Sequence, residues 1–111
     1  MITDKDREVL RNLSQVSEGA RLYIMALGER DKTQEISMFG QAAVRLEDEL
    51  KTSKLTPTGR RSLLNVLHNC YDSLCAETLL PQGLQTDLPY DWSWYIRRKA
   101  EIARELERVV E

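Results

Sequence analysis

The chain has 111 residues, of which 41% are hydrophobic and 31% are charged. This length fits one small domain spanning residues 1–111, and the composition is too apolar for a disordered tail. A net charge of −2 excludes a basic field over the whole protein for nucleic acid and also an acidic mimic of nucleic acid. Nucleic acid is therefore a disfavoured partner.

Two amphipathic patterns occupy the first half of the chain. Thr3 is a candidate N-cap for a first helix that continues to Leu27 and ends at Gly28 as its C-cap. A second helix is predicted to begin near Asp31 or Thr33. Its apolar stripe consists of Ile36, Phe39, Ala43, Leu46 and Leu50.

The two stripes match each other as the sides of an antiparallel helical hairpin. In such a hairpin, residues whose numbers have a constant sum face each other. The pairs are Val9 with Leu50, Leu13 with Leu46, Val16 with Ala43, Ala20 with Phe39 and Tyr23 with Ile36. Gly19 and Gly40 share this sum, which indicates either a close approach of the helices or two tolerated or kinked positions.

Two further helices are predicted in the second half. Thr56 followed by Pro57 is typical of a helix start, and this third helix should end near Leu80. Residues 81–90 are predicted to form a loop that is longer than the usual connection between two helices of a bundle. Asp91 should cap the fourth helix, with Tyr90 and Tyr95 forming a hydrophobic staple. Its inward residues are predicted to be Trp92, Tyr95, Ile96, Ala100, Ala103, Leu106 and Val110.

These elements predict an all-α fold. The leading architecture is an antiparallel four-helix bundle built from two helical hairpins, with the longer loop between helices 3 and 4. The alternative is a pair of hairpins that completes its core only in a dimer.

The sequence favours a cytoplasmic protein without membrane, metal or cofactor partners. It contains no apolar run long enough to span a bilayer, and its first ten residues include five charged ones where a signal peptide needs an apolar core. Cys70 and Cys75 lie on different faces of a predicted helix, so two reduced thiols are expected. One histidine and no close cysteine pair do not provide a zinc ligand set.

A first candidate site is the acid-free segment 51–71, which contains Arg60 and Arg61. Positive charge near a helix N-terminus is unfavourable with the helix dipole. The two arginines and nearby backbone N–H groups are therefore candidates for binding a phosphate or carboxylate. The alternative is that they pair with acids of a neighbouring helix, such as those in 47–49.

A second candidate is a polar line on the third helix, formed by Arg61, Asn65, His68 and Asp72. An arginine followed by a polar residue and then a histidine on a helix of a small bundle resembles the HEPN ribonucleases. That resemblance covers residues 61–68 and implies that Arg61 and His68 hold a scissile phosphate and move protons in a dimer cleft. Ser62 stands where that family usually has Asn, Asp or His. The alternative is a solvated helix face.

The third candidate is the aromatic cluster Tyr90, Trp92, Trp94 and Tyr95. Trp92 and Trp94 are about 200° apart around a helix, so both cannot face one core. If Trp92 points inward, Trp94 lies on the polar face beside Arg97 and Arg98, a combination enriched in protein interfaces. The alternative is that Trp94 folds over the bundle end and covers the long loop.

Taken together, the sequence predicts a non-enzymatic helical module that regulates, adapts or inhibits another protein. The partner-binding residues are predicted to be Trp94, Arg97, Arg98 and Tyr90, and self-association into a homodimer is a further expectation. No phosphate-binding loop, nucleophile elbow or metal set is visible. The alternatives are an RNA-cleaving or RNA-binding bundle using Arg61 and His68, and a small-anion or nucleotide sensor at Arg60 and Arg61.

Overall fold

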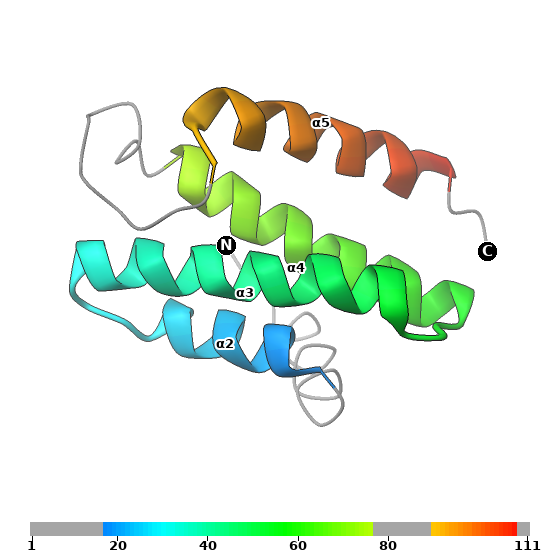
Figure 1. The fold of residues 1–111 in the computed structure, drawn as a ribbon, viewed down its shortest axis with the longest axis horizontal. Coiled ribbons are helices and arrows are strands. Elements are labelled where there is room, and N and C mark those ends of the chain that lie inside the picture. The colour runs from blue at the N-terminus through cyan, green and yellow to red at the C-terminus, as the bar shows by residue number, and fades with distance from the viewer. Residues whose placement is uncertain (1–16, 77–89, 109–111) are drawn as a thin grey trace.

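The computed structural model describes residues 17–76 and 90–108. These residues form four α-helices and no β-strand, so the predicted all-α class is confirmed (Figure 1). The helices are α2 (Glu18–Leu27), α3 (Lys32–Thr52), α4 (Pro57–Ala76) and α5 (Trp92–Arg108). Within the described ranges, no helix is both long enough and apolar enough to cross a membrane. Predictions for 1–16, for the loop at 81–89 and for Val110 lie outside the described residues.

Helix starts follow the capping residues of the sequence. Asp31, Thr56 and Asp91 precede α3, α4 and α5. In each case the side-chain oxygen accepts a hydrogen bond from the backbone N–H three residues later, at 2.9 to 3.0 Å. The predicted start at Thr56 and the predicted cap at Asp91 are therefore confirmed, and of the two positions left open for the second helix, Asp31 is the cap. Gly28 is the C-cap of α2, also as predicted, with φ −92° and so without the left-handed conformation typical of that position.

The predicted unbroken first helix is wrong at Ser17. This residue has an extended backbone (φ −122°, ψ 116°), and its Oγ accepts a hydrogen bond from the N–H of Ala20, so α2 begins after it. The Glu49 carboxylate of α3 accepts from the Ser17 hydroxyl at 2.5 Å and from the Glu18 N–H at 3.0 Å. A carboxylate at a helix N-terminus satisfies free N–H groups and complements the dipole. Apolar periodicity could not reveal this cap, because it comes from another helix.

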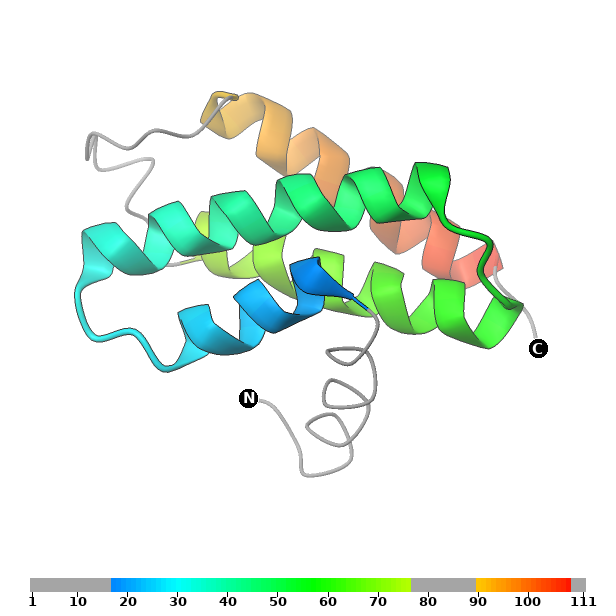
Figure 2. The same ribbon diagram turned by 60° about the horizontal axis from the view of Figure 1, so that its bottom comes forward.

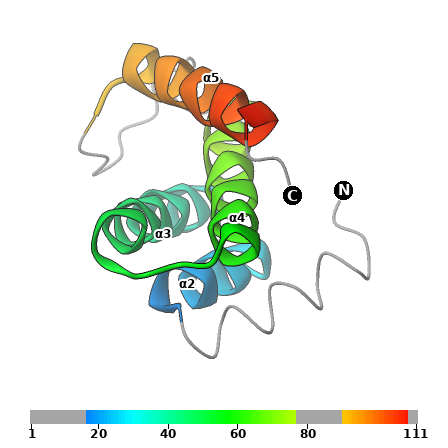
Figure 3. The ribbon, with the colours of Figure 1, turned by 90° about the vertical axis from the view of Figure 1, so that its right-hand side faces the viewer.

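The helices pack around one hydrophobic core to which all four contribute buried side chains. α2 packs on α3 and α4, α3 packs on α4, and α5 packs on α4. Figures 2 and 3 show α2 and α5 on opposite sides of the α3–α4 pair. The largest fully buried side chains include Tyr23, Phe39, Leu46, Leu64, Leu67, Tyr71, Leu74 and Tyr95. On α4 the inner face consists of Leu63, Leu64, Leu67, Cys70, Tyr71 and Leu74, all of which are buried.

α2 and α3 approach closely at Gly19, but opposite Leu46 instead of Gly40. A Cβ atom on Gly19 would lie 2.7 Å from the Leu46 Cγ and 2.9 Å from its backbone nitrogen. Tyr23 packs on Phe39, with ring centroids 5.7 Å apart. These contacts lie about one or two helical turns further along α3 than the constant-sum pairs. The physical reason is that Glu49, near the end of α3, anchors the start of α2.

The predicted inner face of the fourth helix is rotated from the observed one. Tyr95 and Ile102 are buried, whereas Ile96 is 43% exposed and Ala100 is exposed. Trp94, predicted on the polar face, is half-buried and packs against the core. Arg98 was left out of the predicted inner face because it is polar. In the structure it is half-buried, and its guanidinium pairs with carboxylates. The structure does not describe the side chain of Trp92.

Candidate functional site

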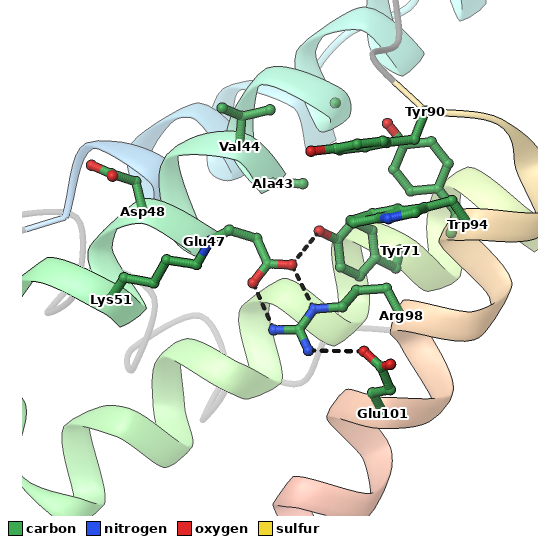
Figure 4. A pocket seen from close by; sticks show the side chains of 12 residues that line it. Ala43, Val44, Glu47, Asp48, Lys51, Tyr71, Tyr90, Trp94, Arg98 and Glu101 are labelled. Atoms are coloured by element: carbon green, nitrogen blue, oxygen red, sulfur yellow. Dashed lines mark hydrogen bonds and ion pairs between the residues drawn. The ribbon is translucent and has the colours of Figure 1, made fainter.

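A groove of about 510 Å³ lies between α3 and α5. No Cα atom of α3 lies within 8 Å of one in α5, so only side chains connect these two helices. The two walls and the end of the groove consist of Gly40, Ala43, Val44, Glu47, Asp48 and Lys51 of α3, Trp94, Tyr95, Arg98 and Glu101 of α5, and Tyr90, which precedes α5. Tyr71 of α4 lies at the floor (Figure 4). On both walls these residues recur at spacings of three and four, which places them on one helix face.

Four aromatic rings form one end of the groove. Tyr90 stacks on Trp94, with ring centroids 3.8 Å apart and planes at 11°. Trp94 also makes edge contacts with Tyr71 and Tyr95, at 5.9 and 5.2 Å. The rings of Tyr90 and Tyr95 lie 6.1 Å apart, which confirms the predicted staple across the α5 cap. Edge-to-face and stacked contacts of this kind favour one arrangement of the rings.

A bridge of three polar side chains crosses the floor of the groove. Arg98 of α5 donates from Nε to Glu47 Oε2 and from a terminal nitrogen to Glu47 Oε1, both at 2.7 Å. The Tyr71 hydroxyl donates to the same carboxylate at 2.9 Å, and Arg98 also donates to Glu101 at 3.2 Å. The Arg98 and Glu47 side chains are only 25% and 17% exposed. A bidentate, partly desolvated ion pair of this kind fixes both the distance and the orientation between α3 and α5.

The bridge and the burial of the rings shift the pKa values of these groups. Its hydrogen bonds to Glu47 raise the pKa of Arg98, so this guanidinium stays charged. Burial and the neighbouring Glu47 carboxylate raise the pKa of Tyr71 well above that of a free tyrosine. Burial raises the pKa of Tyr95 to about 12. Tyr71 and Tyr95 therefore remain protonated hydrogen-bond donors at neutral pH.

The tyrosine shifts predict that stability decreases at alkaline pH. Because both pKa values are higher in the folded chain, the unfolded chain loses these protons first, above pH of about 10. Each tyrosine should lower the free energy of unfolding by up to about 1.4 kcal/mol per pH unit until its folded pKa is reached. Urea unfolding at a series of pH values measures this slope, and Tyr95→Phe should make it shallower. An equal slope for Tyr95→Phe would contradict the prediction.

Three of the four predicted partner-binding residues meet in the groove. Tyr90, Trp94 and Arg98 line it, while Arg97 is exposed on α5 and is not among the lining residues. Tyr90 is 48% exposed, whereas Trp94 is covered on one face by Tyr90. Of the two stacked rings, it is therefore mainly Tyr90 that a partner protein could contact.

The arginines at the start of α4 are placed differently. Arg60 forms an ion pair with Glu105 of α5, with Nε to Oε1 at 3.1 Å. This agrees with the alternative of pairing with a neighbouring helix, although the acid lies in α5 and not in 47–49. Arg61 and His68 are both half-buried on α4, about two helical turns apart. Their predicted roles in RNA cleavage or anion binding stay predictions.

Both cysteines of the chain lie on α4. Cys70 and Cys75 are free thiols, and burial raises the pKa of each. A raised pKa disfavours the reactive thiolate. In the parts of the chain that the structure describes, no group of three or more His, Cys, Asp or Glu residues is arranged to hold a metal ion.

Sequence reasoning missed the α3 wall of the groove. Val44 is 51% exposed, and Glu47 lies one position away from the predicted stripe residue Leu46. The signal was the spacing Gly40, Val44, Glu47 and Lys51, a second helix face beside the core stripe. Tyr71 was not identified as part of a site either: its ring is buried in the core, but its hydroxyl donates to Glu47 in the bridge.

Comparisons of the chain with models of protein families, with curated proteins and with solved structures find no match.

Proposed function

We propose that this protein is a non-enzymatic interaction module that binds another protein in the groove between α3 and α5. In this role it regulates, adapts or inhibits its partner. The observation that carries the proposal is the pair of exposed apolar side chains at one end of the groove, Val44 at 51% and Tyr90 at 48%. Exposed apolar side chains beside a concave, aromatic-lined surface are typical of protein-binding sites.

The bridge at the floor supports this proposal. Arg98, Glu47 and Tyr71 hold the two walls at a defined separation before any partner arrives. A preorganised surface does not have to lose conformational entropy on binding, which favours affinity. Among the described residues that line the groove, no nucleophile, general base and oxyanion donors are arranged as in a catalytic site.

We further propose that the four helices form two antiparallel hairpins, α2 with α3 and α4 with α5, in one cytoplasmic domain. Contacts between Ser17 and Glu49 support the first hairpin, and the Arg60–Glu105 pair supports the second. A homodimer remains part of the proposal. Light scattering would measure its mass, and a monomer at all concentrations would exclude it.

Photochemical cross-linking tests the proposed function. A benzophenone side chain replaces Val44 in the groove or Ile96, which is 43% exposed on α5 and is not among the lining residues. Both variants are irradiated in the cells that make the protein. The proposal predicts a discrete adduct with another protein from position 44 and not from position 96. The same adducts from both positions, or none from position 44, would overturn it.

A further inference from the structure

We propose that the occupant of the groove is an amphipathic helix of the partner protein with an apolar anchor and, about one turn away, a lysine or arginine. The inference rests on the proposed function and specifies the chemistry of the partner. It is drawn from the shape of the groove, the distribution of charge along it and the helical form of its walls.

The groove has the length and walls of a helix-binding site. The lining residues on α3 extend from Gly40 to Lys51, a rise of about 16 Å or three helical turns. On the other wall, Trp94 and Glu101 span about two turns. Helices pack at axial distances of about 8 to 10 Å. A helix lying over the bridge between α3 and α5 would bury Val44 and Tyr90 against its apolar face.

Polar backbone groups favour a helix over an extended peptide. Neither wall is a β-strand, so a docked extended segment would find no ladder of backbone partners among Tyr90, Trp94 and Val44. A helix satisfies its own N–H and C=O groups and presents only side chains to such a surface. An apolar side chain spaced to reach Val44 and Tyr90 is the expected anchor.

Charge complementarity favours a basic partner. The groove is lined by three carboxylates, those of Glu47, Asp48 and Glu101, but only two cations, Lys51 and Arg98. Arg98 donates hydrogen bonds to both Glu47 and Glu101, so its positive charge is paired with carboxylates of the chain itself. Asp48 is exposed on α3, and Glu101 is exposed on α5. The lining as a whole therefore carries a net formal charge of −1, so a partner lysine or arginine near the exposed carboxylates of Asp48 and Glu101 is favoured over an acidic residue.

Selection from a displayed library of random 16-residue peptides tests the inference. The probe library is selected on the wild-type chain and counter-selected on Val44→Glu, with Ile96→Glu as the matched control. Both substitutions place a charge at an exposed position, so neither should disturb folding. Peptides that bind wild type and Ile96→Glu, but not Val44→Glu, are the groove-dependent set.

The groove-dependent peptides should share apolar residues at helical spacing and a lysine or arginine one turn away. Proline between the anchors, or glutamate for the basic residue, should weaken binding at least tenfold. Groove-dependent peptides that tolerate proline, or that are acidic, would overturn the inference and leave the proposed function intact. No groove-dependent peptide would count against both. A wild-type dimer that Val44→Glu converts to monomer would identify a second copy as the occupant and overturn the inference.

Discussion

Replacing Arg98 with methionine is expected to lower the free energy of unfolding by about 2 kcal/mol, or roughly 8 °C in Tm. The substitution keeps most of the apolar stem but leaves the Glu47 carboxylate, only 17% exposed, without its two guanidinium hydrogen bonds. The expected loss is smaller than for a fully buried pair because both side chains retain some contact with water. Urea denaturation at neutral pH measures it.

Arg97→Met is the matched control for Arg98→Met. Arg97 is the preceding residue on α5 and is exposed, so its loss should change stability by less than about 0.5 kcal/mol. In a double-mutant cycle, adding Glu47→Gln to Arg98→Met should cost less than Glu47→Gln costs alone. Equal destabilisation by Arg97→Met and Arg98→Met would show that the bridge does not hold α5 on the rest of the chain.

The second large effect is expected at Gly19. Gly19→Ala should destabilise the chain by about 2 kcal/mol, because the added methyl group would lie 2.9 Å from the backbone nitrogen of Leu46. Either the side chain of Leu46 or the whole of α2 has to move. Gly19 is the second residue of α2, so the helix propensity of alanine should offset this loss by less than the roughly 1 kcal/mol expected in a helix interior. Thermal and urea unfolding both measure the net effect.

Gly28→Ala provides the comparison for Gly19→Ala. At Gly28 the nearest atom to an added Cβ is the Met25 carbonyl oxygen, at an ordinary 3.7 Å, and φ is −92°. Alanine there should be neutral or slightly stabilising. A neutral Gly19→Ala would refute the close approach of α2 and α3.

Local signals predicted the helix starts because their cause is local. Asp31, Thr56 and Asp91 each cap a helix through a bond to a backbone N–H three residues away. The start of α2 was not predictable in this way. Its cap depends on Ser17 together with Glu49, which is distant in the sequence. Apolar periodicity cannot detect a carboxylate that arrives from another helix.

The candidate site was predicted in part for a related reason. Tyr90, Trp94 and Arg98 were identified because aromatic and arginine residues cluster in the sequence. Of the two interpretations of Trp94, the exposed polar face is wrong because this side chain is half-buried against the core, and the inner face of α5 also includes Arg98. An arginine belongs on an inner face only when a carboxylate such as Glu47 is placed opposite, and this pairing is a tertiary contact.

The central claim is that the groove between α3 and α5 is the partner-binding surface. Its most direct test is the affinity of the purified chain for the protein cross-linked at position 44, measured by titration calorimetry. Val44→Glu should weaken binding at least tenfold, while Ile96→Glu should leave it within about twofold. Equal affinities for wild type and Val44→Glu would contradict the claim.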